Sequence, residues 1–206
     1  SQILRFVREC FDHDDGGYSI IFHEIPSVYA TSNAIEVIKD ALLVENNKKL
    51  INDNNNFGVS ELKTERIQSI ITFLRKTRND FAICDELVDK NSDALCVLYL
   101  AWRLLWNLNK EDIFFELMPS DKLRKYIDNC YHKGGFSSRP QQKEPSIANT
   151  YFALSLIKRL VENRNNPKVC LEMYNDFYTK RKDEIINFVN SCWDNDGGGF
   201  RAAIGS

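Results

Sequence analysis

The sequence predicts an all-α protein built from repeated helical hairpins, and three observations support that prediction. A phrase of one cysteine, an aromatic residue, glycines and a second aromatic residue occurs at residues 8–18, 128–136 and 190–200. Each copy ends an amphipathic segment, and a longer, more apolar segment follows each of the first two copies. No segment shows the period-two alternation of a strand. Repetition of this kind is typical of repeat architectures.

The first helix of each predicted hairpin, the outer helix, is amphipathic. Counted from the cysteine, an aromatic residue stands four positions earlier and an aliphatic residue three positions earlier. The cysteines are Cys10, Cys130 and Cys192, and the aromatic residues are Phe6, Tyr126 and Phe188. A degraded fourth copy keeps this register with Phe73 and Leu74, and Thr77 takes the place of the cysteine. The spacing places the apolar side chains on one face of a helix.

Glycines and a serine mark the passage from each outer helix to an inner one. The aromatic residues that close the turns are Tyr18, Phe81, Phe136 and Phe200. Paired glycines suit a backbone that needs positive φ or close packing. Serines nine to eleven residues after the first three aromatic residues are predicted N-caps, at Ser27, Ser92 and Ser146. After these serines we predict inner helices at 28–43, 93–108 and 147–161. Their opening turns carry little charge, so we expect them to be mostly buried.

The composition favours a single soluble domain over residues 1–206. The chain is 43% hydrophobic and 27% charged, and its length suffices for one well-buried core. No apolar run approaches the length that spans a membrane, and the start lacks the order of a signal peptide. The net charge of −2 argues against nucleic-acid binding, which needs a basic face.

Six cysteines occur in the chain, and none forms a C-x-x-C pair. A chain of this size does not need disulfides, so we interpret the cysteines as reduced and predict a cytoplasmic location. The cysteine that recurs at the end of the outer helix, such as Cys130 near His132, is interpreted as a small packed thiol. The same pair could also suggest a metal site or a nucleophile.

The segment "GGFSSRPQQKEPSIANTYFALSLI" at 134–157 resembles the repeat of the α/α toroids, the family of protein prenyltransferase β subunits and terpenoid cyclases. The matching positions are Pro145, Ile147, Ala148, Thr150, Tyr151 and Ala153. Residues 16–38 form a second, weaker instance. The resemblance implies an α/α-toroid fold of which the chain holds about three and a half hairpins. Since a closed toroid has about six hairpins, we expect a partial toroid and a fragment of a longer one.

The resemblance also implies a ligand cavity. Inner helices in that family surround an apolar funnel that accepts an isoprenoid tail. By analogy, Tyr29, Trp102, Trp106 and Tyr151 line such a cavity. The alternative is that these residues fill the core between inner and outer helices, as buried aromatic residues usually do.

The zinc ligands of protein prenyltransferases are not matched. These enzymes hold zinc with an Asp and a Cys of a D-x-C-Y pattern and a later His, so that the acceptor thiol binds as a thiolate. Asp93 and Cys96 are one residue too far apart for that pattern, and Ser146 and Ala148 stand at the other position that can be aligned with it. We expect no cofactor, and zinc stays open.

The diphosphate-binding residues of the family have a partial match. Arg139 and Lys143 in "GGFSSRPQQK" resemble the GGF-x-G-R-x-x-K context, with one residue inserted. A basic pair beside a glycine turn can hold a diphosphate, so these two residues are the predicted clamp.

Two acidic phrases suggest other chemistry. "DHDD" at 12–15 matches the D-x-D-D pattern of terpene cyclases, whose middle Asp is the catalytic acid. It lies in a glycine turn, however, whereas the catalytic pattern stands at the start of an inner helix. At the start of the second inner helix, Asn91 stands in the place of that acid. The turns at 12–17 and 194–199 resemble the start of a calcium loop but lack its glutamate at position 12. We therefore expect these Asp residues to stabilise the turns, and calcium stays open.

These departures favour a binding module without independent catalysis, whose ligand is a protein partner or an isoprenoid group. The alternative is part of an isoprenoid-using enzyme, a protein prenyltransferase or a terpene cyclase, whose catalytic residues lie outside this chain. Stacked repeats without a cap expose core surface. A protein partner, or the rest of the toroid, is therefore expected to cover the apolar edge.

Overall fold

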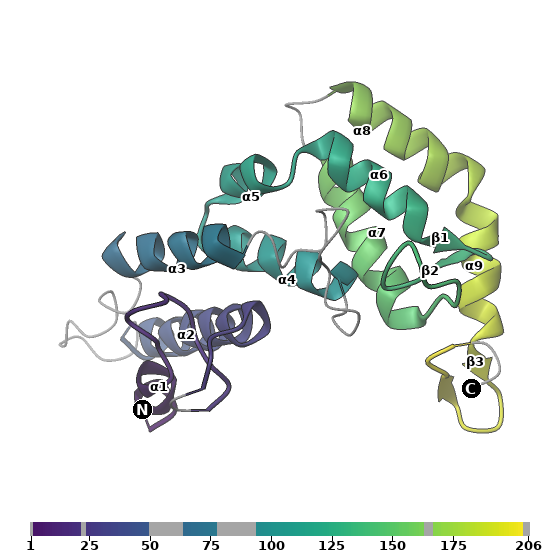
Figure 1. Cartoon of the computed structure of the whole chain (residues 1–206). Coiled ribbons are helices and arrows are strands. Elements are labelled where there is room, and N and C mark those ends of the chain that lie inside the picture. The colour runs from purple at the N-terminus through teal and green to yellow at the C-terminus, as the bar shows by residue number, and fades with distance from the viewer. Residues whose placement is uncertain (1, 22–23, 50–63, 78–93, 163–166, 204–206) are drawn as a thin grey trace. The chain divides into compact units, whose positions relative to one another are not determined.

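The computed structural model describes residues 2–21, 24–49, 64–77, 94–162 and 167–203 (Figure 1). Most of these residues are helical, and the strands among them are two residues long. The predicted all-α, helical-hairpin fold is therefore confirmed. The chain divides into two compact units, one of residues 1–79 and 100–114, the other of residues 80–99 and 115–206. The single domain over 1–206 stays a prediction.

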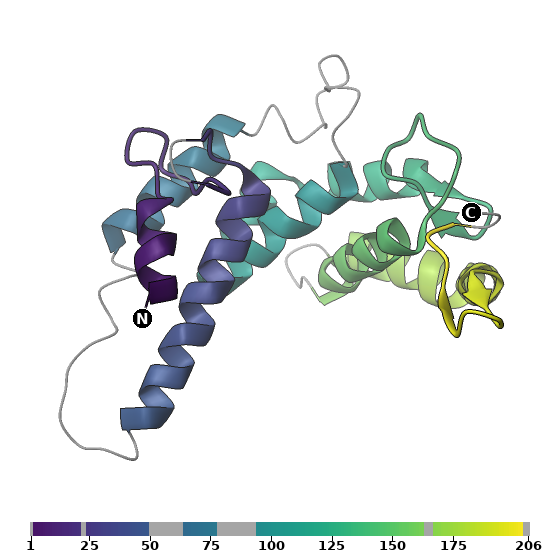
Figure 2. The same cartoon turned by 90° about the horizontal axis from the view of Figure 1, so that it is seen from below.

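The first unit contains the first outer and inner helices. Its helices are α1 (Gln2–Glu9), α2 (Val28–Lys49), α3 (Thr64–Lys76) and the second half of α4 (Ala94–Asn107). The short helix α5 (Glu111–Leu117) begins in this unit and ends in the second. Helix α1 packs beside α2 (Figure 2).

The second unit contains the third hairpin and the fourth outer helix. Its described part begins with the first half of α4, residues 94–99. Its other elements are α6 (Ser120–Cys130), β1 (Tyr131–His132), β2 (Gly135–Phe136), α7 (Ile147–Glu162), α8 (Pro167–Met173), a π-helix (Tyr174–Lys180), α9 (Lys182–Ser191), β3 (Trp193–Asp194) and β4 (Gly199–Phe200). Helices α6, α7 and α8 pack against one another (Figure 1). The repeated sequence phrases did not predict α5, α8 or the π-helix.

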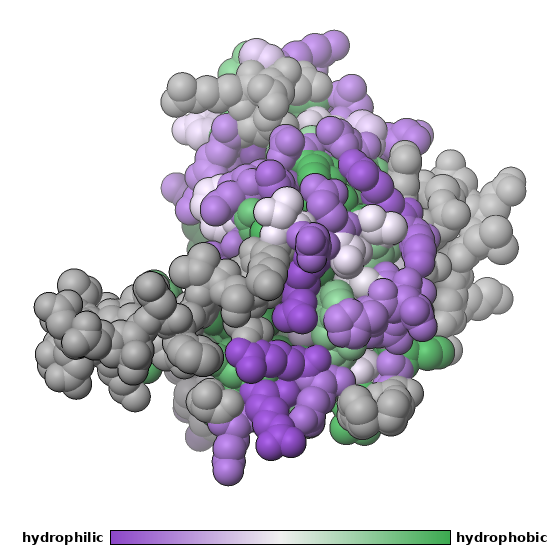
Figure 3. Space-filling model, turned by 90° about the vertical axis from the view of Figure 1, so that its left-hand side faces the viewer, coloured by the Kyte–Doolittle hydropathy of each residue, from purple (hydrophilic) through white to green (hydrophobic). Residues whose placement is uncertain are grey.

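The outer helices α3 and α6 carry polar residues toward solvent, as their amphipathic pattern predicted, whereas α1 also exposes Ile3 and Phe6. The face in Figure 3 shows mainly hydrophilic side chains, with hydrophobic ones scattered between them. Within the described ranges, no helix combines the length and the apolar character needed to cross a bilayer.

The glycine turns share one geometry in both units. Phe11 pairs with Tyr18, Tyr131 with Phe136 and Trp193 with Phe200, each pair across a short antiparallel bridge. The rings of each pair meet edge to face, with centroids 4.9, 5.2 and 5.0 Å apart. This is the preferred geometry of aromatic pairs. The repeated sequence phrase is therefore a repeated aromatic hairpin.

The recurring cysteines are packed thiols, as predicted. Cys10, Cys130 and Cys192 are buried and are not in disulfides. Their backbone carbonyls accept a hydrogen bond from the residue after each closing aromatic residue, at distances of 3.0, 2.9 and 2.7 Å. Burial raises the pKa of the Cys10 thiol, so the thiol stays protonated and unreactive.

The predicted serine N-caps are confirmed at two positions. The backbone N–H of Ala30 donates to Ser27 Oγ and that of Asn149 donates to Ser146 Oγ, both at 3.1 Å. The third predicted cap, Ser92, lies outside the described residues. Four residues after each confirmed cap, a threonine ties the inner helix to the turn before it. Thr31 Oγ1 and Thr150 Oγ1 accept the backbone N–H of Tyr18 and Phe136, at 2.9 and 3.1 Å.

The glycine pairs receive the next outer helix. Gly134 has a φ of +82°, and a Cβ built on it would lie 2.5 Å from the backbone oxygen of Glu184 in α9. A Cβ on Gly135 would lie 2.6 Å from the ring of Phe188. The first unit repeats this contact, with Phe73 of α3 packed 3.1 Å from the Cβ position of Gly17. Glycine is needed here because the backbone approach leaves no room for a side chain.

The aspartates of two turns stabilise them, as predicted. Asp12 Oδ1 accepts the backbone N–H groups of Asp14 and Asp15, at 2.8 and 2.9 Å. Asp194 Oδ1 accepts the backbone N–H of Asp196 at 3.1 Å. These are turns in which the side chain replaces a backbone acceptor.

We predict that Gly135→Val destabilises the second unit, because the new side chain collides with Phe188. The expected loss is about 3 kcal/mol of unfolding free energy, as for other overpacked sites. Gly199→Val is the matched control, since a Cβ on Gly199 meets no described atom within 4 Å. Its expected effect in dilute solution is below about 0.5 kcal/mol. Urea unfolding followed by circular dichroism measures both, and equal losses would contradict the packing argument.

We also predict that Asp12→Asn weakens the acid sensitivity of the fold. The backbone N–H of Asp15, aided by that of Asp14, holds the pKa of Asp12 below its ordinary value. A lowered pKa contributes stability that is present above the unfolded pKa of about 3.9 and is lost as the pH falls through the folded pKa. The asparagine keeps the acceptor oxygen without the charge. Between about pH 5 and about pH 2, its unfolding free energy should therefore fall less than that of the unaltered protein. Urea titrations at each pH measure this, and equal falls in unfolding free energy for the variant and the unaltered protein would refute the prediction.

Candidate functional site

The inner helix of the second unit exposes an aromatic side chain. Tyr151 of α7 leaves 56% of its surface exposed. Its hydroxyl lies 3.1 Å from that of Tyr99 in α4, and the two rings meet edge to face at 5.6 Å. The ring of Phe152 stacks on Tyr99 at 5.2 Å. We call these three residues the Tyr99 cluster.

The inner helices of the first unit expose aromatic side chains as well. Tyr29 of α2 is 54% exposed and Trp106 of α4 is 44% exposed. Trp102, whose ring centroid lies 5.7 Å from that of Trp106, is 5% exposed. The burial of Trp102 fits the alternative of core packing, whereas Tyr29 and Trp106 present apolar surface as a cavity lining would.

A polar network joins the inner helices of the first unit. The guanidinium of Arg103 in α4 donates to Asn33 Oδ1 at 2.9 Å and lies 2.8 Å from a carboxylate oxygen of Glu36 in α2. Lys39 Nζ donates to Asn107 Oδ1 at 3.1 Å. These contacts fix α2 against α4, so the aromatic residues on the same two helices stand on a rigid pair.

The structure places the two residues of the predicted diphosphate clamp in different environments. Arg139 is 7% exposed, in the loop after β2, and Lys143 is exposed. The carbonyl of Arg139 accepts hydrogen bonds from Ser137 Oγ at 2.7 Å and from the backbone N–H of Gln142 at 3.1 Å. The loop backbone is therefore held in place, and Lys143 is the more accessible of the two cations.

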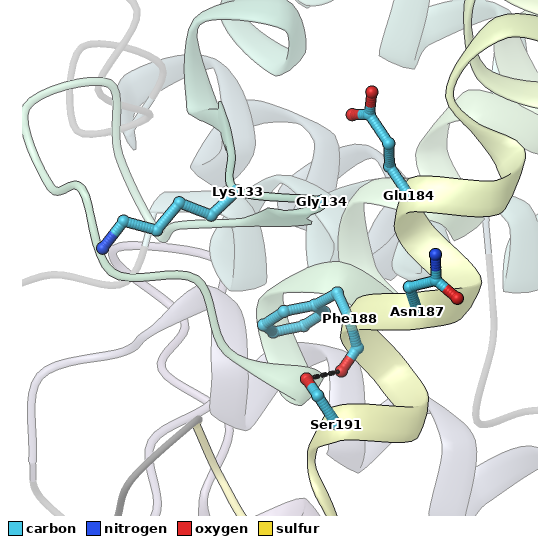
Figure 4. A pocket seen from close by; sticks show the side chains of 6 residues that line it. All are labelled: Lys133, Gly134, Glu184, Asn187, Phe188 and Ser191. Carbon is cyan, nitrogen blue, oxygen red and sulfur yellow. Dashed lines mark hydrogen bonds between the residues drawn. The ribbon is translucent and has the colours of Figure 1, made fainter.

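An open groove of about 440 Å³ lies between the glycine turn that joins β1 to β2 and helix α9 (Figure 4). Its lining residues are Lys133, Gly134, Glu184, Asn187, Phe188 and Ser191. Three polar side chains of this lining, those of Lys133, Ser191 and Glu184, have protein partners. Lys133 Nζ donates to Glu144 Oε1 at 3.3 Å, and Ser191 Oγ donates to the Phe188 carbonyl at 2.6 Å. The groove therefore runs along the line where the turn at Gly134 packs against α9.

Glu184, at the rim of this groove, is held by a tyrosine. The hydroxyl of Tyr131 donates to Glu184 Oε2 at 2.6 Å. Burial, together with the neighbouring Glu184 carboxylate, raises the pKa of Tyr131 above its ordinary value. Tyr131 therefore stays protonated as a hydrogen-bond donor and does not serve as a base.

Charged residues brace the π-helix against α6. Arg181 Nη1 donates to Asp128 Oδ1 at 2.9 Å, and its guanidinium covers the rings of Tyr131 and Phe177 at 4.5 and 4.8 Å. Arg124 of α6 forms an ion pair with Glu172 of α8. This paired arrangement stabilises the outer layer and leaves the aromatic side chains of the inner helices as the stronger candidates for a binding surface.

A metal centre has no candidate ligand set in the part of the chain that the structure describes. There, no three or more His, Cys, Asp or Glu side chains group as metal ligands do. Asp93 and Asn91, on which the sequence arguments about zinc and acid catalysis partly rested, lie outside the described residues. So do His23 and Gly205, which stand at position 12 of the two turns that resemble a calcium loop.

Comparison with known protein families matches residues 66–206 to the prenyltransferase alpha-alpha toroid domain. Because the match covers more than half of the 206 residues, the chain belongs to this family. No curated protein matches the chain. The hairpin before the matched range has the same aromatic pair and the same threonine contact, at Tyr18 and Thr31, so the repeat extends toward the N-terminus.

Sequence reasoning missed two members of the Tyr99 cluster. Tyr99 stands three positions before Trp102 on α4, and Phe152 directly follows Tyr151. Helical spacing could have indicated Tyr99, since residues three apart share a face. Phe152 carried no such signal, because neighbours in a helix point about 100° apart.

Proposed function

We propose that this toroid domain is a binding module for an isoprenoid group and has no catalytic activity of its own. The observation that carries the proposal is the exposure of Tyr29, Trp106 and Tyr151 on inner helices. Apolar surface left in water costs about 25 cal/mol per Å² relative to burial. A prenyl chain laid against the exposed ring of Tyr151 would recover part of that free energy, and membership of the prenyltransferase toroid family supports this choice of ligand.

The Tyr99 cluster suits an apolar ligand although it contains two hydroxyl groups. The hydroxyls of Tyr99 and Tyr151 lie within hydrogen-bond distance of each other. A ligand without polar atoms would therefore leave each hydroxyl with one hydrogen-bond partner, which lowers the desolvation penalty of burying the rings.

The start of α7 supports binding without catalysis. Ser146 and Ala148 stand where the family resemblance expects zinc ligands. Ser146 Oγ is engaged as the N-cap acceptor for Asn149, and Ala148 carries only a methyl group. Neither side chain can hold zinc for thiolate activation. An enzyme that contains this domain would have to draw its catalytic residues from outside the chain.

We predict that Tyr151→Ala weakens the binding of geranylgeranyl diphosphate by about tenfold or more, the effect of losing about 1.4 kcal/mol of contact. Tyr174→Ala is the matched control, because Tyr174 is also half-exposed but lies on the π-helix of the outer layer. Native mass spectrometry and calorimetry measure the complex. Equal affinities of the two variants, or no binding by the unaltered chain, would overturn the proposal.

The clamp prediction has its own test. If Lys143 grips the diphosphate, Lys143→Gln should weaken the binding of geranylgeranyl diphosphate several-fold and leave that of geranylgeraniol unchanged. Lys168→Gln on α8, also exposed, is the control. If the affinities for both ligands fall to the same extent, or neither falls, Lys143 does not contact the diphosphate.

A further inference from the structure

The ring of Tyr99 is held between two neighbouring residues of α7. Phe152 stacks on this ring with the centroids 5.2 Å apart, and Tyr151 meets it edge to face at 5.6 Å. Tyr99 is 8% exposed, so packing fixes the position of its side chain. Tyr99, Tyr151 and Phe152 all belong to the second unit, so their contacts lie within one compact body.

Tyr151 is held at both ends of its side chain, although more than half of its surface is exposed. At the backbone end, the preceding residue Thr150 accepts the N–H of Phe136 at 3.1 Å and donates to the carbonyl of Ser146 at 2.7 Å. At the far end, the hydroxyl of Tyr151 lies 3.1 Å from that of Tyr99. The ring between these ends also meets that of Phe152 edge to face, at 5.7 Å.

Such a restraint matters for a ring on which a ligand packs. An exposed tyrosine without it moves between staggered rotamers on a timescale of picoseconds to nanoseconds. A ligand that immobilises the ring opposes this motion, and the lost side-chain entropy weakens binding by about two- to tenfold. A ring that the protein already holds in place avoids that loss.

We propose that Tyr99 is a positioning residue for the isoprenoid site, and that its hydroxyl holds the ring of Tyr151 in the orientation in which a prenyl chain packs on it. This inference rests on the proposed isoprenoid binding. It assigns Tyr99 a role that needs no contact with the ligand. Tyr99 suits this role because its own ring is buried and therefore anchors the hydroxyl of Tyr151.

The test compares two variants that break the same hydrogen bond. Tyr99→Phe and Tyr151→Phe each remove one hydroxyl and keep the ring. In calorimetry, each should weaken the binding of geranylgeranyl diphosphate by about two- to tenfold. The double variant should bind no more weakly than the weaker single variant, because the interaction is already lost in each. Additive losses, or no loss in either single variant, would overturn the proposal.

Tyr131→Phe is the matched control. It removes a hydroxyl that also has a protein partner, Glu184, but that lies outside the Tyr99 cluster. Its affinity for geranylgeranyl diphosphate should equal that of the unaltered chain. An equal loss in this control would show that the effect of Tyr99→Phe is not specific to the cluster, and would count against the proposal.

Geranylgeraniol separates positioning from a direct contact with the head group. This ligand has the same prenyl chain and no diphosphate, so both single variants should weaken its binding by the same factor. A loss confined to geranylgeranyl diphosphate would overturn the proposal, because the hydroxyls would then bind the diphosphate itself.

Ring motion can be measured without any ligand. NMR relaxation of ¹³C-labelled tyrosine rings reports the order parameter of Tyr151, whose signal is identified by its absence from Tyr151→Phe. The order parameter should be lower in Tyr99→Phe than in the unaltered chain, and an unchanged value would overturn the positioning role. If the unaltered chain binds no isoprenoid, the proposed function fails. A ring that becomes mobile in Tyr99→Phe would then still show that the positioning contact is correct, so the two failures are distinguishable.

Discussion

The close approach of a glycine turn to the next outer helix is the constraint on which the rest of the fold depends. At Gly134 and Gly135 the backbone of the turn touches the backbone and the aromatic side chain of α9 at distances that exclude a Cβ. Interiors are packed as tightly as crystals, so neighbouring elements must adapt to a contact that cannot lengthen. The spacing of successive hairpins follows from it.

The same turn determines how the inner helix is placed. Thr150 receives the backbone N–H of Phe136 and donates to the carbonyl of Ser146 at 2.7 Å, which ties the first turn of α7 to β2. Thr150 is 2% exposed, and Tyr151, rotated by about 100° around the helix, is 56% exposed. The hydrogen bonds of Thr150 to the glycine turn therefore determine that Tyr151 faces outward from the inner helix.

Local features could be read from the sequence, and features that depend on distant neighbours could not. The serine caps and the glycine turns were predicted because each depends on residues a few positions apart. Trp102 and Trp106 lie one turn apart on α4, and spacing alone treats them alike, yet one is buried and the other is not. The burial of Arg139 likewise depends on the packing around its loop. Helix α8 and the π-helix were missed because no cysteine-glycine phrase follows them directly, although Val169, Met173 and Phe177 form a buried stripe at spacing of four.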